Sequence, residues 1–180
     1  MSDTTYDCVK GEATKAYDTT KLSKWTRQFV YLKPYIFVIF DNVITTSSSY
    51  QKKWNIVPVT LPEDQGGCVL KITNGAGALW IKKLLPVGGT VTFSSSQISV
   101  VPNSPGTQDF FLHVMQAVDS NKGEKQVIAD DATVVEAGDW FHVEVGSRKV
   151  SFSKNGDFQF NGSDRIPPNP PADFKKTKEN

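Results

Sequence analysis

Hydrophobic and polar residues alternate along most of this chain. The alternation has a period of two and is interrupted at Gly, Pro and Asn, and no segment shows a sustained helical stripe of apolar residues. Such a pattern is typical of short half-buried strands and indicates an all-β chain. The predicted strands are 25–32, 35–44, 51–60, 69–73, 78–85, 90–93, 97–101, 110–118, 125–128, 133–136, 140–145, 149–153 and 157–160.

The number of predicted strands favours two stacked sheets. About a dozen short strands at close spacing form an antiparallel two-sheet β-sandwich more readily than one open sheet. The run 35–40 has no polar side, so we expect it in the middle of the core, covered on both faces. Lys33-Pro34 predicts a tight turn before this strand. Asn74-Gly75 and Asn155-Gly156 predict type I′ hairpin turns.

Length and composition fit one ordinary globular domain. The chain has 180 residues, 38% of them hydrophobic and 22% charged. We expect a β-sandwich over residues 1–164 and, because 165–180 are rich in Pro and Lys, a tail or linker at the end. The only two cysteines, Cys8 and Cys68, are expected to be free thiols.

Charge and hydropathy argue against a nucleic-acid partner and against a membrane span. The formal net charge is +1, and no run of like charges marks a nucleic-acid binder. The longest apolar run, 36–40, is far shorter than the about 18 residues that cross a bilayer. The first residues also lack the basic and apolar regions of a signal peptide.

Five ordered motifs point to a known family. They are VKGEATKAY (9–17), TRQFVYLKP (26–34) with FVIFDNV (37–43), KW (53–54), KKLLP (82–86), and DFFLHVMQ (109–116) with FSKNG (152–156). This series resembles the C-terminal β-sheet domain of heparinase II/III-type polysaccharide lyases. The resemblance implies a β-sandwich, a bacterial, periplasmic or secreted setting, and association with an α/α toroid that holds most of the active site. That family cleaves uronic-acid-containing polysaccharides by β-elimination.

The family's catalytic residues have no counterpart in this sequence. The resemblance implies a His in strands before the VKGEATKAY motif, where only 1–8 stand here, and in zinc-carrying relatives a His soon after the KW motif. This chain has Asn55 and Ile56 after Trp54. We therefore assign no catalytic and no metal-binding residue by resemblance, and we expect no enzyme in the isolated chain.

Two histidines were weighed for chemistry. His113 shares a strand face with Phe111 and Met115, which favours a core or interface role over catalysis. Trp140, His142 and Glu144 share one face of a predicted strand, so this triplet either binds a sugar ring, serves as an acid/base pair, or is an ordinary exposed face.

Cofactor candidates are weak. Two isolated histidines do not supply the three ligands of catalytic zinc. The acidic pairs 63–64 and 130–131 are predicted in loops, where they offer oxygens to calcium but resemble no EF-hand. We predict no cofactor.

The tryptophans give the sequence its binding candidates. Lys53 and Trp54, and likewise Trp80 and Lys82, join an aromatic ring to a cation, a combination suited to an anionic glycan. The alternative is that both rings belong to the core.

The sequence therefore favours a non-catalytic, carbohydrate-associated β-sandwich. The alternatives are a fragment of a polysaccharide lyase and a packing domain. The packing alternative implies an apolar face that associates with a toroid or with a second copy of the chain.

Overall fold

The computed structural model describes residues 4–119, 132–160 and 163–164. Within this part the chain is almost entirely β, with antiparallel pairing throughout and a single 3₁₀ turn, η1 (Thr14–Ala16). The predicted strand at 125–128, the acidic pair 130–131 and the predicted tail at 165–180 lie outside the described residues. The all-β sandwich is confirmed.

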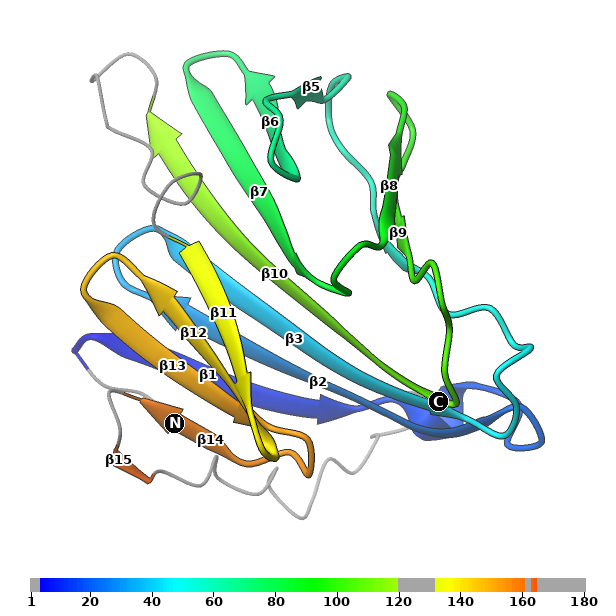
Figure 1. Ribbon diagram of the computed structural model, residues 1–180. Helices are drawn as coiled ribbons and strands as arrows, with labels where there is room; N and C mark the ends of the chain where they lie inside the picture. Colours follow the sequence, from blue (N-terminus) through cyan, green and yellow to red (C-terminus); the bar gives the residue numbers. More distant parts are fainter. Residues whose placement is uncertain (1–3, 120–131, 161–162, 165–180) are drawn as a thin grey trace, which may run out of the picture.

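A long central sheet organises the molecule (Figure 1). Its seven strands, in spatial order, are β1 (Tyr6–Glu12), β2 (Leu22–Leu32), β3 (Ile36–Thr45), β10 (Gln108–Asp119), β7 (Gly77–Leu85), β6 (Val69–Asn74) and β5 (Glu63–Asp64).

Two smaller sheets accompany it. The five-stranded sheet contains β11 (Ala132–Ala137), β12 (Trp140–Val145), β13 (Arg148–Ser153), β14 (Phe158–Phe160) and β15 (Ser163–Asp164). The three-stranded sheet contains β4 (Trp54–Ile56), β9 (Ile98–Val101) and β8 (Thr90–Phe93).

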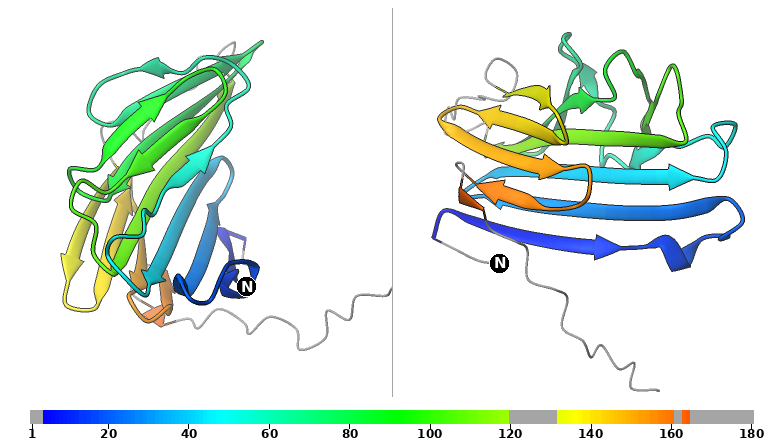
Figure 2. Two further views of the ribbon diagram at one scale, coloured as in Figure 1. Left: turned by 90° about the vertical axis from the view of Figure 1, so that its right-hand side faces the viewer. Right: turned by 60° about the horizontal axis from the view of Figure 1, so that its bottom comes forward.

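The central sheet is covered on both faces, as the turned views show (Figure 2). We call the face toward the five-stranded sheet the inner face and the other the outer face. The inner core lies between these two sheets and includes Val38, Phe40 and Phe152. The outer core lies under the three-stranded sheet and includes Ile39 and Trp54. The sandwich thus carries a third, smaller layer, which the sequence did not predict.

Strand β3 confirms the predicted central position. It lies between β2 and β10, and its alternating apolar residues enter both cores. Burying each such side chain contributes about 1.5–3 kcal/mol, so residues 36–40 are a major source of the fold's stability, whereas Tyr35 precedes the strand and is 38% exposed.

Several local predictions need correction. Glu63 and Asp64, predicted in a loop, form the exposed edge strand β5. The predicted strand 51–60 is reduced to β4, because prolines at 58 and 62 interrupt ladder pairing. In the described part, the only non-glycine residue with a positive φ is Cys68, so neither predicted Asn-Gly pair supplies the two positive-φ residues of a type I′ turn.

Strand β1 was not predicted. It is an edge strand with only Tyr6 and Cys8 fully buried, and Gly11 lies near its end, so its alternation is short. Both cysteines are free, as expected, with Cys8 buried and Cys68 exposed. Burial raises the pKa of the Cys8 thiol to about 11, which keeps this thiol protonated and unreactive.

Candidate functional site

A groove on the outer face is the main candidate site. It has a volume of about 590 Å³, within the usual range of ligand sites. Its floor is formed by β2 and β3 beyond the edge of the three-stranded sheet. Its walls are the segment that leads into β2 and the link from β3 to β4. We call it the outer groove; its aromatic and charged lining residues are Tyr17, Asp18, Lys21, Trp25, Arg27, Asp41, Tyr50, Lys52, Lys53, Trp54 and Phe111.

Asp41 organises the floor. Its carboxylate is almost fully buried and accepts hydrogen bonds from Arg27 Nε at 2.7 Å, Arg27 Nη2 at 2.8 Å and Trp25 Nε1 at 3.1 Å. The bonds to Asp41 raise the pKa of Arg27 further above its usual range, and the guanidinium lies 5.7 Å from the centre of the Trp25 ring. One buried anion therefore fixes an aromatic face and a cation side by side.

One edge of the Arg27 guanidinium has no partner among the described residues. Asp41 occupies the edge made by Nε and Nη2, and no described residue pairs with Nη1. The residue opposite Arg27 on β1 is Gly11, and a Cβ built there meets no atom within 4 Å. The half-exposed guanidinium is thus open from the side of β1, with a donor geometry that suits a carboxylate or sulfate.

The wall before β2 adds a second ring. Tyr17 packs edge-on against Trp25, with 5.2 Å between the ring centres. The Thr20 hydroxyl and backbone N–H both donate to Asp18 and lower the pKa of this carboxyl group. Thr46 in turn fastens the wall to β3, since its hydroxyl donates to the Thr20 carbonyl at 2.7 Å.

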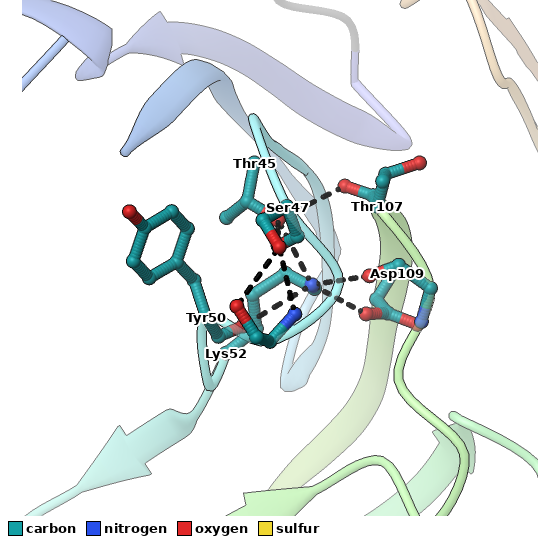
Figure 3. A network of polar contacts seen from close by, with 8 residues as sticks. Thr45, Ser47, Tyr50, Lys52, Thr107 and Asp109 are labelled. Atoms are coloured by element: carbon teal, nitrogen blue, oxygen red, sulfur yellow. Dashed lines mark hydrogen bonds and ion pairs between the residues drawn. The ribbon is translucent and has the colours of Figure 1, made fainter. Parts of the chain in front are cut away.

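The opposite wall is fastened by a buried lysine (Figure 3). Lys52 Nζ donates to the Gly106 carbonyl at 2.6 Å and to Thr45 Oγ1 at 3.2 Å, and it pairs with Asp109 Oδ2 at 2.9 Å. Its neighbour Lys53 is exposed. The two lysines therefore differ in role: Lys52 holds the wall in place, and Lys53 offers charge to the groove.

We expect opposite consequences from removing each lysine. Lys52→Met should lower the free energy of unfolding by about 2 kcal/mol, because Asp109 loses its buried partner. Lys53→Met should change it by less than about 0.5 kcal/mol, because the side chain is exposed. Urea denaturation of the two variants measures both values. Equal losses would show that Lys52 does not fasten the wall.

The predicted binding residues lie on three separate surfaces. Lys53 and Trp54 line the outer groove, although Trp54 is only 4% exposed and its ring is stacked on His113 with 3.7 Å between centres. Trp80 and Lys82 lie on the inner face, where Trp80 packs against the inner core and Lys71 lies 5.5 Å from its ring. The structure does not bring these two pairs together.

The third predicted group lies on the five-stranded sheet. Trp140, His142 and Glu144 share the face of β12 that points away from the inner core, as strand parity predicts. His142 Nδ1 lies 2.7 Å from Ser151 Oγ on the neighbouring strand. These side chains do not line the outer groove.

His113 is buried in the outer core beside Phe111 and Met115, on the face that the sequence predicts. Burial, with smaller contributions from the charges of Lys83 and Arg27, lowers the pKa of His113 to about 3. No described residue hydrogen-bonds to either ring nitrogen. The imidazole is therefore neutral at physiological pH and lies behind Trp54, away from the groove.

The described residues show neither a metal-ligand cluster nor a membrane-spanning helix. In residues 4–119 and 132–160, no three His, Cys, Asp or Glu side chains are grouped as metal ligands would be. The described residues also contain no helix of the length and hydropathy that a bilayer crossing requires.

Sequence reasoning missed the groove's central residues, which are Trp25, Arg27 and Asp41. Two features of the sequence could have identified them. Parity places Trp25 and Arg27 on one face, and a tight turn at Lys33-Pro34 sets the register that pairs Arg27 with Asp41.

Solved structures share this fold. The heparan sulfate lyase HepC from Pedobacter heparinus matches with a TM-score of 0.57 and 11% identity, over 89% of this chain and 26% of the lyase. A mutant of the same lyase gives 0.56 and 13%, and a heparinase III gives 0.56 and 14%, over 83% of this chain and 25% of that one. No family model and no curated protein matches the sequence.

The fold is thus that of a β domain found in heparan sulfate lyases. The resemblance to heparinase II/III-type lyases that the motifs indicated is confirmed at the level of fold. This chain spans about a quarter of the length of these lyases.

Proposed function

We propose that this chain is a non-catalytic domain that binds an acidic polysaccharide in the outer groove. The observation that carries the proposal is the arrangement of Trp25 and Arg27 around Asp41, which holds a half-buried aromatic ring and a guanidinium edge without a described partner close together in the groove. Sugar rings pack their C–H faces on aromatic rings, and carboxylate or sulfate groups pair with guanidinium.

The charge of the groove supports an anionic ligand. Lys52 is paired with Asp109 and Arg27 with Asp41, so the exposed charges of the lining are the cations Lys21 and Lys53 and the carboxylate of Asp18. Two of the fold neighbours are named as heparan sulfate lyases, whose substrate is acidic.

A second candidate is an accessory domain of a larger lyase. It is favoured by the small share of the matched lyases that this chain covers. In that setting the groove would present the polysaccharide to an α/α-toroid partner, which supplies catalysis. Both candidates require the same groove to bind glycan.

Affinity electrophoresis tests the binding. The protein is run through gels that contain heparan sulfate, chondroitin sulfate, alginate or neutral xylan. We expect retardation by an acidic polymer, weaker at higher salt, and none by xylan.

Position 11 offers a matched pair of variants. Gly11→Glu places a carboxylate beside Arg27 and should reduce retardation several-fold, whereas Gly11→Lys adds a cation and should increase it. Both side chains enter open space, so the fold should tolerate them equally. Trp140→Ala serves as the control on another surface. If Trp140→Ala abolishes retardation and Gly11→Glu leaves it unchanged, the binding site lies on the five-stranded sheet and not in the outer groove.

A further inference from the structure

The outer face of β2 continues beyond the groove as a row of large side chains. Trp25, Arg27, Phe29 and Tyr31 occupy alternate positions of one strand, so all four point to the outer face. Alternate strand residues are about 7 Å apart, and the row therefore spans about 20 Å. This length exceeds what a single sugar ring can contact.

The far half of the row is a fixed aromatic surface. Tyr31 stacks on Phe37 with 4.7 Å between ring centres and 13° between planes, and Phe29 lies 5.6 Å from the same ring. Phe37 itself packs against the outer core. The rings are therefore positioned before a ligand arrives, which lowers the entropy lost on binding.

The described residues cover this row only in part. The three-stranded sheet packs over β10, β7 and part of β3, while Phe29 remains 36% exposed and Val9, its neighbour on β1, is more exposed still. Gly11 adds no side chain beside Arg27. On the β1 side the row is therefore open at Arg27, and beyond it the row is flanked by Val9 and by Asp7, whose carboxylate pairs with Lys33 at 3.2 Å.

We propose that the glycan site extends along β2 from Trp25 to Tyr31 and selects an extended acidic chain of several sugars over a single sugar or disaccharide. This inference rests on the proposed function of the outer groove. We call the row the β2 track.

The charge within the row favours a glycan over an apolar protein surface. Arg27 lies in the middle of the track, and no described residue pairs with its Nη1. A flat apolar partner would bury this cation edge without supplying an acceptor, at a desolvation cost. An acidic chain supplies rings to Phe29 and Tyr31 and an anion to Arg27.

Oligosaccharides of defined length test the track. Heparan sulfate, chondroitin sulfate and alginate disaccharides and octasaccharides are titrated into the wild-type protein by calorimetry. We expect the octasaccharide of at least one series to bind at least about tenfold more tightly than its disaccharide.

Variants locate the extra affinity. Phe29→Ala and Tyr31→Ala should weaken octasaccharide binding about fivefold and leave disaccharide binding unchanged. Phe93→Ala is the matched control, because Phe93 is 38% exposed and lies on β8, away from the track. This control should bind both lengths like the wild type.

The outcomes separate the two proposals. If disaccharide and octasaccharide bind equally tightly and Gly11→Glu weakens both, the track is overturned and the proposal that the outer groove binds glycan is retained. No binding of any series would overturn both. A third outcome is that light scattering shows a dimer, that Phe29→Ala converts it to a monomer, and that octasaccharides bind no more tightly than disaccharides. This outcome would assign the face to a second copy of the chain and overturn the track.

Discussion

Replacing Arg27 with Ala is expected to lower the free energy of unfolding by about 3 kcal/mol, because it leaves the carboxylate of Asp41 buried without its cation. The Asp41 side chain is 2% exposed, and in the described part Trp25 Nε1 would be its one remaining donor. The Arg27 side chain is 42% exposed, so its own desolvation adds little. Urea denaturation at neutral pH measures the loss.

The reverse substitution should cost less. Asp41→Asn keeps the shape of the side chain and leaves the guanidinium half in water, so we expect a loss of about 1–2 kcal/mol. The double variant Arg27→Ala with Asp41→Leu should be more stable than Arg27→Ala alone, because no buried charge remains unpaired. A double variant that is no more stable than Arg27→Ala would contradict this account.

The fold was predictable because the alternation that marks each strand is a local pattern. The run 35–40 has no polar side, and this alone places β3 between two cores. Strands β8 and β12 were predicted at both ends, since turn residues bound them closely. Strand β1 was missed because an edge strand with one buried face shows little apolar signal.

The groove was harder to predict because four strands and two connecting segments contribute its lining. Parity along β2 groups Trp25 with Arg27, but only the register of the β2–β3 hairpin pairs Arg27 with Asp41. The sequence interpretation relied instead on Trp next to Lys in the chain, which says nothing about burial. Trp54 shows the consequence: its neighbour Lys53 is exposed, while its own ring is stacked on His113 inside the outer core.

The third layer explains the same difficulty for His113. Its strand face was predicted, but an isolated sandwich would leave that face partly open to water. The three-stranded sheet closes it, and Trp54 covers the imidazole. The histidine for which the sequence favours a core or interface role thereby becomes a fully buried neutral group.

This burial predicts a loss of stability in acid. The pKa of His113 is lowered to about 3 in the folded protein, chiefly by burial and further by the charges of Lys83 and Arg27, whereas it is about 6.5 in an unfolded chain. Above about pH 6.5 both states are neutral at this residue, and its contribution to stability is fully present. As the pH falls below 6.5, only the unfolded state takes up the proton, so stability decreases until the folded pKa is reached.

The size of the effect follows from the shift. Each pH unit below 6.5 costs about 1.4 kcal/mol, which gives a loss of about 2 kcal/mol at about pH 5 and about 4 kcal/mol near pH 3. Carboxylates contribute least in the upper part of this window. Urea denaturation between about pH 7 and pH 5 is therefore the sharpest measurement of the histidine.

His113→Phe should abolish this acid loss. Phe preserves a flat ring against Trp54 and removes two ring nitrogens that no described residue pairs with, so stability at neutral pH should be unchanged or higher. His142→Phe is the control, since that ring is only partly buried on the five-stranded sheet. If His142→Phe abolishes the acid loss of stability and His113→Phe does not, the buried imidazole of His113 is not the cause of that loss. The acid sensitivity would then arise from His142 on the five-stranded sheet.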